Sequence, residues 1–363
     1  MKVRWLALGA MAALFAAGGL AACNKLGGAK PAASAAAACD RACLVGVMDK
    51  YLAALPAHDP AAAPLASNVK FTEQAAQIPV GDGLWLSATE APTTFKIVAA
   101  DPTSGQVGAI VTMKEWDKPI LLAARLKVAD GKITEIENVI ARDLRPASMA
   151  NLNTPRQALL DDVPAAERTP RDQMLAAAFS YFDSIEQDDG TVAPFADDCT
   201  RHENGLQTTN NKTAPASPLG GASSDLSRAL AKLGAMTCKD SMSTQSLQYI
   251  TMIRPRHVLI IDEQKGLAYS FPRFVHRGDN RHYKILGVPG VDAIDMPFGP
   301  MDLQAGEMFK IVGGKIHEIE AMGFINAYMA PTGWDSEYPE TYKYDTTHPK
   351  VHPYTAGTTY PAK

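Results

Sequence analysis

The residues best suited to chemistry stand at the end of one short stretch, Phe195–Glu203, which reads FADDCTRHE. Its last three residues place a cation, an imidazole and a carboxylate side by side, a set that can hold an anion or move a proton. If the stretch is a β-strand, successive side chains face opposite ways. Arg201 and Glu203 then share one face, where Arg201 pairs with Glu203 or holds an anionic group of a substrate. His202 lies on the other face and is a weaker candidate for contacting a substrate.

An earlier stretch, Leu65–Glu73, is a weaker copy (LASNVKFTE) and indicates which face is interior. In it, Val69 and Phe71 alternate with polar residues and share a face with the final carboxylate, Glu73. Two apolar side chains on one face of a strand indicate that this face is buried. By the same register, we expect the carboxylate of Glu203 to point into the domain. Such a position is costly for a charged group unless the group is paired or neutralised.

These two stretches belong to an internal repeat that spans most of the chain. Leu44–Gln74 aligns without gaps with Met174–Asn204. The segment GKITEIE, which begins at Gly131, likewise aligns with GKIHEIE, which begins at Gly314. The second copy is longer because of two insertions, one before and one after the segment Asp262–Gly266. The chain therefore contains two structural units of the same kind.

Each copy has the same order of expected elements. Apolar residues at helical spacing predict a first helix in each copy. They are Leu44, Met48, Tyr51, Leu52 and Leu55 in the first copy, and Met174, Phe179, Phe182 and Ile185 in the second. Runs rich in β-branched residues then predict strands. These runs are Phe95–Ala99, Gly108–Met113, Ile120–Val128 and Ile133–Ile140 in the first copy, and Val258–Ile261, Leu267–Val275, Glu307–Val312 and Lys315–Met322 in the second. Helices packed on one side of an antiparallel sheet make an α+β domain.

Composition places the boundaries of these units. We assign residues 1–22 to a signal peptide, 23–38 to a lipidated flexible tether, 39–148 to the first domain, 149–170 to a charged linker that contains proline, 171–326 to the second domain and 327–363 to an extended tail. The tail is rich in Pro, Tyr and Thr and lacks periodicity. We therefore expect it to wrap the second domain rather than form a domain of its own.

The N-terminus has the layout of an export signal. Lys2 and Arg4 precede a short apolar run that ends in Leu-Ala-Ala-Cys, which resembles the lipobox of bacterial lipoproteins. In such proteins the cysteine, here Cys23, becomes the lipidated first residue and anchors the chain in a membrane. Asn24 follows it in place of the aspartate that holds such proteins at the inner membrane, so we expect the periplasmic face of the outer membrane. The alternative is an ordinary secretory signal with a chance cysteine.

The remaining four cysteines indicate disulfides, because their number is even and the chain reads as exported. Proximity in the sequence favours the pairs Cys39–Cys43 and Cys199–Cys238. We expect no metal, because no histidine stands at ligand spacing from either pair. The net charge of −4 gives no electrostatic case for nucleic acid. No glycine-rich phosphate loop is present, and we expect no cofactor. The oligomeric state stays open.

With these features, the chain resembles a tandem of nuclear-transport-factor-2-like domains, the SnoaL-like and ketosteroid-isomerase-like superfamily. Lys50–Leu55 reads KYLAAL where the first helix of ketosteroid isomerases reads RYVAAL. The letters FADD from Phe195 match the start of their pocket strand. The resemblance implies two cone-shaped domains, each a curved antiparallel sheet wrapped around N-terminal helices to enclose a pocket.

The resemblance also implies roles for single residues. Glu203 falls on the general base of ketosteroid isomerases, and Tyr181 and Glu307 fall on the two groups that donate hydrogen bonds to the oxyanion. Glutamate replaces aspartate at both acidic positions. The equivalents in the first copy are Tyr51, Glu73 and Ala124. Because the second acid is missing there, the resemblance implies that the first copy is structural or binds something passively.

Strand alternation supports an inward position for Glu307, which shares a face with Phe309 and Ile311. Two carboxyl groups in one apolar pocket can divide the work, since one stays ionised as a base while burial keeps the other protonated as a donor. We therefore expect Glu203 to remove a proton next to a carbonyl group. Tyr181 and Glu307 would then hydrogen-bond the developing oxyanion.

Other polar residues of the second copy are candidates to contact a substrate. They are Arg273 and His317, and His317 shares a strand face with Ile319 and Ala321, so we expect it to reach the cavity as well. The second insertion begins with the polar segment His276–Tyr283, which we expect to be a polar lid or a solvated loop.

The leading hypothesis is a periplasm-facing lipoprotein whose second domain binds a small apolar organic ligand and catalyses cofactor-free proton transfer, as an isomerase or lyase. The alternative is a non-catalytic module that binds a ligand, a glycan or a protein, or a scaffold with its domains packed face to face. Structural interpretations also stand beside the catalytic ones. Tyr181 can be a core aromatic, Glu203 and Arg201 can form an ion pair, and Glu307 can lie at the rim. Fold alone does not choose among these hypotheses.

Overall fold

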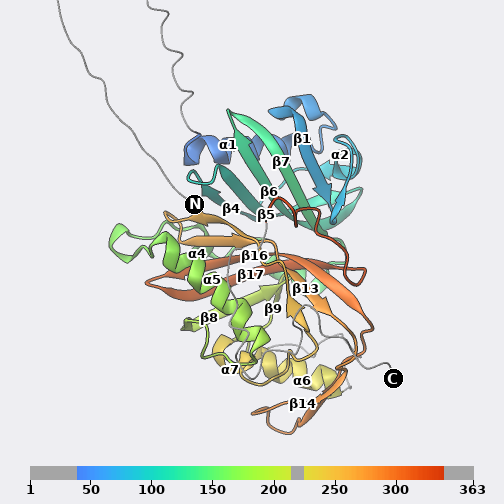
Figure 1. Ribbon diagram of the computed structural model, residues 1–363, viewed down its shortest axis with the longest axis vertical. Coiled ribbons are helices and arrows are strands. Elements are labelled where there is room, and N and C mark those ends of the chain that lie inside the picture. The colour runs from blue at the N-terminus through green and yellow to red at the C-terminus, as the bar shows by residue number, and fades with distance from the viewer. Residues whose placement is uncertain (1–38, 214–224, 339–363) are drawn as a thin grey trace, which may run out of the picture. The chain divides into compact units, whose positions relative to one another are not determined.

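The computed structural model describes residues 39–213 and 225–338, and Figure 1 shows the elements that they form. Helices and β-sheets occur together in both halves of this part of the chain, which confirms the predicted α+β class. The predicted signal peptide, Cys23 and the predicted tether lie outside the described residues, as does the tail after Tyr338.

The first half contains one long helix and a seven-stranded sheet of order β2-β1-β7-β6-β5-β3, in which β4 also pairs with β5. Its elements are α1 (Arg41–Ala54), the 3-10 turn η1 (Pro60–Ala62), β1 (Leu65–Glu73), β2 (Ala76–Gln77), α2 (Leu84–Ser87), β3 (Ala88–Glu90), β4 (Lys96–Asp101), β5 (Gln106–Glu115), β6 (Lys118–Ala129) and β7 (Lys132–Ala141). Asp40 caps α1 by accepting a hydrogen bond from the amide of Cys43.

The second half repeats this plan with an eight-stranded sheet of order β10-β13-β16-β17-β8-β9, to which β11 and β12 are added beside β16. Its elements are α5 (Arg171–Glu186), β8 (Phe195–Glu203), β9 (Leu206–Gln207), α6 (Asp225–Gly234), α7 (Cys238–Met242), β10 (Met252–Ile253), β11 (Val258–Asp262), β12 (Leu267–Ser270), β13 (Arg273–His276), β14 (His282–Lys284), β15 (Ala293–Asp295), β16 (Met301–Val312) and β17 (Lys315–Asn326). The strands β14 and β15 form a separate hairpin from the second insertion.

The expectation of antiparallel sheets is wrong for one pair of strands in each half. β1 runs parallel to β7, and β8 runs parallel to β17, whereas the other strands pair antiparallel. The reason is topological. The strand that follows the first helix is placed beside the last strand of the half, so the whole antiparallel meander becomes the connection between two parallel strands.

Alternation along the strands divides each sheet into two apolar faces. On β6, the side chains of Leu122, Ala124 and Leu126 pack with helix α1, whereas Leu121 and Ala123 point to the opposite face. The second sheet behaves in the same way, because residues of its inner face pack with α5 and those of its outer face do not. Each half thus has its own core between helix and sheet.

The outer faces of the two sheets pack against each other and form a third apolar core. It joins Ile110, Leu121, Ala123 and Val139 of the first half to Ile260, Tyr269, Met308 and Met322 of the second. The two halves therefore pack face to face, whereas the scaffold role itself stays a hypothesis. The face that each half uses is the outer face of its sheet.

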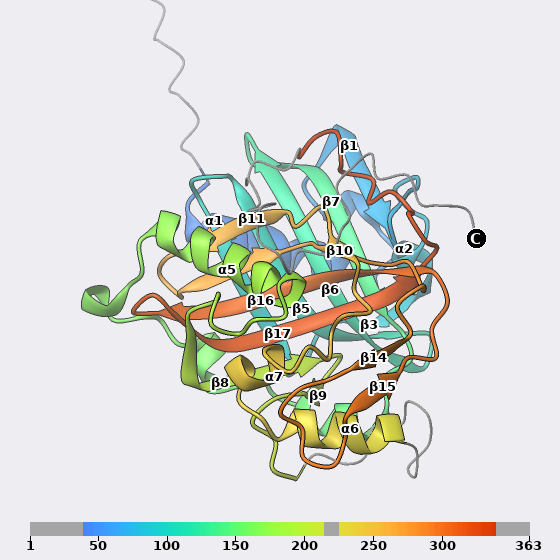
Figure 2. The same ribbon diagram turned by 60° about the horizontal axis from the view of Figure 1, so that its bottom comes forward.

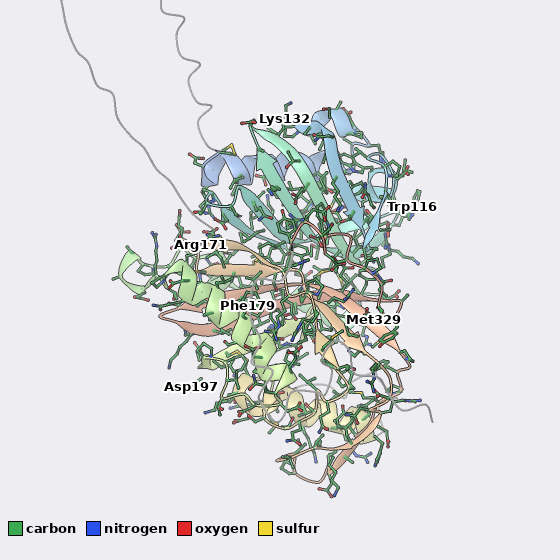
Figure 3. All side chains as sticks on the ribbon, viewed as in Figure 1. Trp116, Lys132, Arg171, Phe179, Asp197 and Met329 are labelled. Carbon is green, nitrogen blue, oxygen red and sulfur yellow. A yellow bond between two sulfur atoms is a disulfide. The ribbon has the colours of Figure 1, made fainter. Side chains whose placement is uncertain are left out.

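Two reciprocal ion pairs cross this contact. Arg41, the first residue of α1, binds Asp262 of the second half at 2.9 Å. Arg171, the first residue of α5, binds Asp101 of the first half at 2.6 Å, where α5 approaches the first half (Figure 3). Arg41 and Arg171 occupy equivalent places in the two copies, and so do Asp101 and Asp262. The halves therefore contact each other through equivalent surfaces, as the subunits of a two-fold symmetric dimer do.

The segment between the halves is short but structured. It contains α3 (Pro146–Asn151), α4 (Gln157–Leu160) and the 3-10 turn η2 (Ala165–Glu167). Arg156, at the start of α4, binds Glu318 at 2.6 Å and Glu320 at 2.8 Å on the outer face of β17. The predicted linker thus adheres to the second sheet.

The described part of the tail contacts both halves, and Arg273 and His257 of the second half bond to the carbonyls of Ala330 and Tyr338. Trp334 is fully buried against the first sheet, and its indole donates a hydrogen bond of 2.8 Å to Thr72 on β1. Its ring lies 4.3 Å from the ammonium nitrogen of Lys70 and 4.5 Å from the guanidinium of Arg125. Tyr338 donates to Glu135 at 2.6 Å. The tail crosses to the first half because these strands offer it cations and a buried acceptor.

Candidate functional site

The candidate site is built on a row of three residues across the second sheet. Glu203 on β8 is paired in register with Ala321 on β17, and Ala321 with Glu307 on β16. Residues paired in this way point to the same face, which here is the inner face toward α5. Ala321, whose side chain is a single methyl group, stands between the two glutamates in the register.

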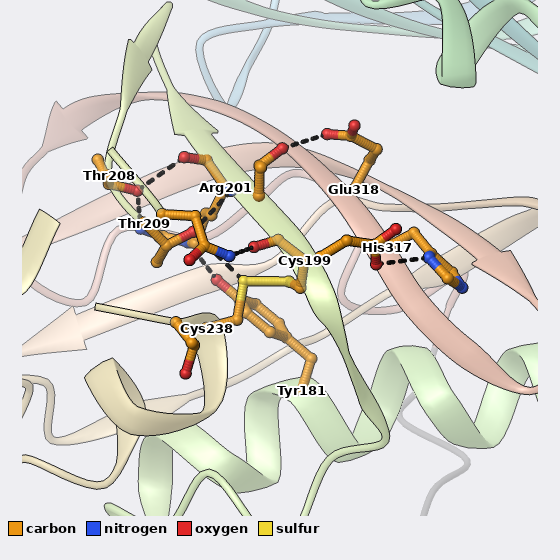
Figure 4. Close-up of a disulfide and its surroundings, with 12 residues drawn as sticks. Tyr181, Cys199, Arg201, Thr208, Thr209, Cys238, His317 and Glu318 are labelled. Carbon is orange, nitrogen blue, oxygen red and sulfur yellow. Dashed lines mark hydrogen bonds and ion pairs between the residues drawn. A yellow bond between two sulfur atoms is a disulfide. The ribbon is translucent and has the colours of Figure 1, made fainter. Parts of the chain in front are cut away.

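Tyr181 reaches this row from helix α5. It is fully buried, and its ring packs against Phe195 at a centroid distance of 6.3 Å and against Phe309 at 5.0 Å. Its hydroxyl accepts a hydrogen bond of 2.8 Å from Nε of Arg201 (Figure 4). Within residues 39–213 and 225–338, no acceptor takes the hydroxyl proton, which leaves this O–H able to donate to a ligand.

Arg201 ties the other polar groups together. Besides Tyr181, it donates from Nη1 to Thr208 at 3.1 Å and from Nη2 to the carboxylate of Glu203. Burial opposes the positive charge, but Glu203, Tyr181 and Glu307 together hold the pKa of the Arg201 guanidinium well above its ordinary value. Every nitrogen of this guanidinium is engaged, which fixes its orientation on the inner face.

Glu203 shares the predicted face but lies at the edge of the domain. Its side chain is 49% exposed, since it is the last residue of β8 and a turn follows at Asn204 and Gly205. The carboxylate is therefore open to solvent on one side and paired with Arg201 on the other.

Glu307 has the opposite environment. It is 1% exposed, and its Oε2 has no hydrogen-bond partner in the described part of the chain. Burial raises the pKa of this carboxyl group to about 8, with Glu203 adding to the rise and Arg201 opposing it. At neutral pH, Glu307 is consequently a buried carboxylic acid with a proton to donate.

Replacing Glu307 by glutamine should stabilise the protein most at alkaline pH. The pKa of about 8 in the folded state lies above the ordinary value of 4.5, so unfolding releases a proton between these two values. Stability is therefore lost as the pH rises through that window. Glutamine keeps the shape without the charge. Urea titrations at about pH 5, 6.5 and 8 span this window. They should show that the difference in unfolding free energy between variant and wild type grows with pH.

A difference that stays constant with pH would show that Glu307 is not held protonated. Glu320 also has its pKa raised, to about 7, by burial. Because Glu320 is present in both proteins, its contribution cancels in the comparison.

The first half carries a reduced version of the same row. Glu73 is paired in register with Asn138, and Asn138 with Ala124. Tyr51 on α1 exchanges hydrogen bonds with Asn138 at 2.8 and 3.1 Å. Glu73 accepts from the amide of Leu84 at 3.0 Å. In the first half these polar groups thus hydrogen-bond to one another, whereas in the second half Oε2 of Glu307 has no such partner among the described residues.

The structure does not bring the other candidate residues to this row. His202 is 4% exposed on the outer face, where burial, Arg156 and Arg201 lower its pKa to about 3. Arg273 is paired in register with Gln304 and thus also faces outward, where it donates to the carbonyl of Ala330 at 2.7 Å. Neither side chain shares the face of Glu307.

His317 is turned away by a β-bulge. The pairing of β17 shifts register between Ile316 and Glu318, so Ile316 takes the inward place that a regular strand would give to His317. His317 instead binds Asp198 at 2.7 Å near the edge of the sheet (Figure 4).

Both predicted disulfides are present. Cys39 and Cys43 are joined at the start of α1, with Cα atoms 5.2 Å apart. Cys199 and Cys238 join β8 to α7, with Cα atoms 5.9 Å apart (Figure 4). The second bridge fixes the strand that carries Arg201 and Glu203.

Sequence reasoning missed two residues of the site, Thr208 and Tyr249. Thr208 accepts a hydrogen bond from Nη1 of Arg201, and burial raises the pKa of Tyr249, with Glu203 adding to the rise and Arg201 opposing it. The short strand before Thr208, β9, corresponds to β2 of the first copy, where Ile78 stands in place of Thr208 and has no side-chain acceptor. Tyr249 lies in the first insertion, which has no counterpart in the first copy, so comparison of the copies could reveal neither residue.

Comparisons with known proteins concern the second half. A family model described as a domain of unknown function (DUF8021) matches residues 167–323, the part of the chain from η2 through α5 to β17. No curated protein matches the chain. Among the described residues, no helix combines the length and apolar character needed to cross a membrane.

Proposed function

We propose that the second half binds a small, largely apolar organic molecule with a carbonyl group and moves a proton on it without a cofactor, as an isomerase or lyase does. The observation that carries this proposal is Glu307, a buried carboxylic acid with an unpaired oxygen in one row with Glu203. Burial of an ionisable group without a partner is costly, and proteins place such groups where chemistry needs them.

In the proposed mechanism, the carbonyl oxygen of the ligand accepts hydrogen bonds from Tyr181 and Glu307. Glu203 removes a proton from the neighbouring carbon, and the electron pair of the broken C–H bond moves to the oxygen as an enolate. The two donors stabilise the developing negative charge. Return of the proton to another carbon completes an isomerisation, and loss of a leaving group would complete a lyase reaction. Arg201 orients Glu203 and Tyr181.

The binding step is tested with 2-naphthol, a fluorescent aromatic alcohol whose oxygen can accept from both donors. We expect the full chain to bind it and Tyr181→Phe to bind it about tenfold more weakly, since one hydrogen bond is lost. Tyr51→Phe removes the equivalent hydroxyl of the first half and should leave the affinity unchanged. Equal losses in the two variants, or no binding by the wild type, would contradict a site at Tyr181.

The proton transfer is tested by exchange of the α-protons of cyclohexanone in heavy water, followed by mass spectrometry. We expect wild type to accelerate the exchange and Glu203→Gln to abolish the acceleration. The ion pair between Arg201 and Glu203 favours a second candidate, a binding module in which this carboxylate is structural. Binding of 2-naphthol without any acceleration of exchange would select that candidate.

The cellular setting belongs to the same proposal. We propose that the chain is exported, lipidated at Cys23 and anchored in the outer membrane facing the periplasm, as the residues LAAC at the end of the apolar run suggest. We also propose that each half is a cone-shaped domain that encloses its own interior. Both disulfides suit an exported protein, since such bonds persist outside the reducing cytosol.

A further inference from the structure

The two disulfides of the chain have opposite surroundings. Cys199 and Cys238 are both fully buried, and their bond joins positions 39 residues apart. Cys43, in contrast, is exposed, and its partner Cys39 is half-buried against the core of the first half. This second bond joins positions only four residues apart, at the start of α1 (Figure 3). A thiol in solution can therefore approach Cys43 without any opening of the fold.

The start of α1 is held in place by interactions other than the disulfide. Asp40 accepts a hydrogen bond of 2.9 Å from the amide of Cys43 and so caps the helix. Arg41 binds Asp262 of the second half at 2.9 Å. Figure 2 shows α1 close to β11, the strand that ends at Asp262. The first turn of α1 therefore keeps two attachments when the bond between the sulfur atoms breaks.

The second copy shows that the same local structure forms without a disulfide. Thr169 and Gln173 stand at the positions equivalent to the two cysteines. Helix α5 still begins at Arg171, the equivalent of Arg41, and Arg171 binds Asp101 at 2.6 Å. A short loop also gains little stability from closure, because the entropy that a disulfide removes from the unfolded chain grows with loop length. Stability alone therefore gives little reason for this bond.

We propose that Cys39–Cys43 is a thiol–disulfide exchange site that accepts two electrons from a dithiol. A dithiol suits this bond because it can attack with one sulfur and then leave as a disulfide by using the other. The exchange needs none of the carboxyl groups of the second half. It is therefore an activity beyond the proposed function, and each can fail without the other.

The exchange consists of two displacements at sulfur. One thiolate of the dithiol attacks the sulfur of Cys43, the bond between Cys43 and Cys39 breaks, and Cys39 leaves as a thiolate. The second thiolate of the dithiol then attacks the dithiol sulfur of this mixed disulfide, and Cys43 leaves as a thiolate. The dithiol has lost two electrons and become a disulfide. The two cysteines have gained these electrons and bind the two protons that the dithiol released.

The position at the start of a helix favours this chemistry in both directions. The amino end of a helix stabilises negative charge, which favours the thiolates that leave in the two steps. The Cα atoms of Cys39 and Cys43 are 5.2 Å apart, within the range that a disulfide requires. The cap at Asp40 and the ion pair of Arg41 keep this spacing after reduction. The two thiols therefore stay within reach of each other and close again on an oxidant such as glutathione disulfide.

The rate of exchange is tested with dithiothreitol, a small dithiol, on the folded full chain. Samples are blocked with N-ethylmaleimide, and mass spectrometry then measures each cysteine. We expect Cys39–Cys43 to be reduced at least about a hundredfold faster than Cys199–Cys238, because the buried bond must wait for an opening of the fold. Replacement of dithiothreitol by glutathione disulfide should then restore the bond.

The direction of attack is tested with glutathione, a monothiol that stops at the mixed disulfide. Trypsin cleaves after Arg41, so digestion places the two cysteines in separate peptides. At early times, we expect about tenfold more glutathione on Cys43 than on Cys39, because Cys43 is the accessible partner. Equal amounts on both cysteines, or an excess on Cys39, would contradict the proposed attack at Cys43.

A pair of double variants separates an exchange site from a structural bond. Cys39→Ser with Cys43→Ser should leave the urea midpoint of unfolding close to that of the wild type, whereas Cys199→Ser with Cys238→Ser should lower it clearly. Equal losses in the two double variants would mean that Cys39–Cys43 is structural. Equal rates of reduction for the two disulfides of the wild type, or failure of Cys39–Cys43 to close again, would overturn the proposal without any variant.

Discussion

Replacing Tyr269 by alanine should lower the free energy of unfolding by about 4 kcal/mol, the cost typical of deleting a fully buried aromatic ring. Tyr269 on β12 is fully buried in the core between the two sheets. Two glycines make room for it. An added Cβ would lie 2.4 Å from its ring at Gly108 of the first half, and 3.0 Å from its hydroxyl at Gly306 of the second. Denaturant titration of the full chain measures the effect.

Two matched variants separate this effect from others. Tyr269→Phe loses only a hydrogen bond of 3.3 Å to the carbonyl of Ala109 and should cost about 1 kcal/mol or less. Tyr328→Ala removes a ring that is 40% exposed and should stay within about 0.5 kcal/mol of the wild type. A loss below about 1 kcal/mol for Tyr269→Ala would show that this ring does not hold the sheets together.

The core around Tyr269 accounts for the coupling between the halves. Gly108 and Tyr269 stand at equivalent places in the two copies, so the side chain present in one half fits the space that the other half leaves empty. Such complementarity requires the copies to differ at this position. The repeat has therefore diverged where the halves touch. It has also diverged at the candidate site, where Glu307 of the second copy stands at the position of Ala124 in the first.

The sequence predicted where the helices and strands lie better than it predicted which strands pair with one another. Helix spacing placed Tyr51 on an inward face, the resemblance indicated Tyr181, and alternation on the strands placed Glu203 and Glu307 on inward faces, as the register now shows. These features depend on local periodicity, which the chain encodes residue by residue. The parallel pairing of β8 with β17 depends on contacts between distant segments, so no local pattern predicted it.

The misplaced residues have equally specific causes. We predicted the wrong face for His317 because one bulge inverts the alternation of β17, and a shift of one residue moves a side chain to the other face. Tyr249 lies in an insertion without periodicity or a second copy. Trp334 lies in a tail that docks on Lys70 and Arg125 of the first sheet, far away in the sequence. Residues on regular strands could be predicted, and residues positioned by irregular segments could not.

Replacing Asp101 or Asp262 by alanine should each lower the free energy of unfolding by about 3 kcal/mol, because each change leaves buried donors without their acceptor. Both side chains are almost completely buried. Asp101 accepts from Arg171 and from the amide of Ile261, whereas Asp262 accepts from Arg41 and from the amide of Ala100. Since the two sets of contacts are equivalent, the two losses should agree within about 1 kcal/mol.

The pH dependence gives this prediction a second readout. Burial alone would raise the pKa of Asp101, but hydrogen bonds from Arg171 and the amide of Ile261 hold it below its ordinary value of 3.8. Its contribution to stability is therefore fully present above that value and is lost as the pH falls through the lower pKa of the folded state. The difference in unfolding free energy between Asp101→Ala and wild type should shrink below that pH.

Asp49→Ala, which breaks only an exposed pair with Lys96, should cost less than about 1 kcal/mol. If it costs as much as Asp101→Ala, burial between the halves does not explain the strength of these pairs.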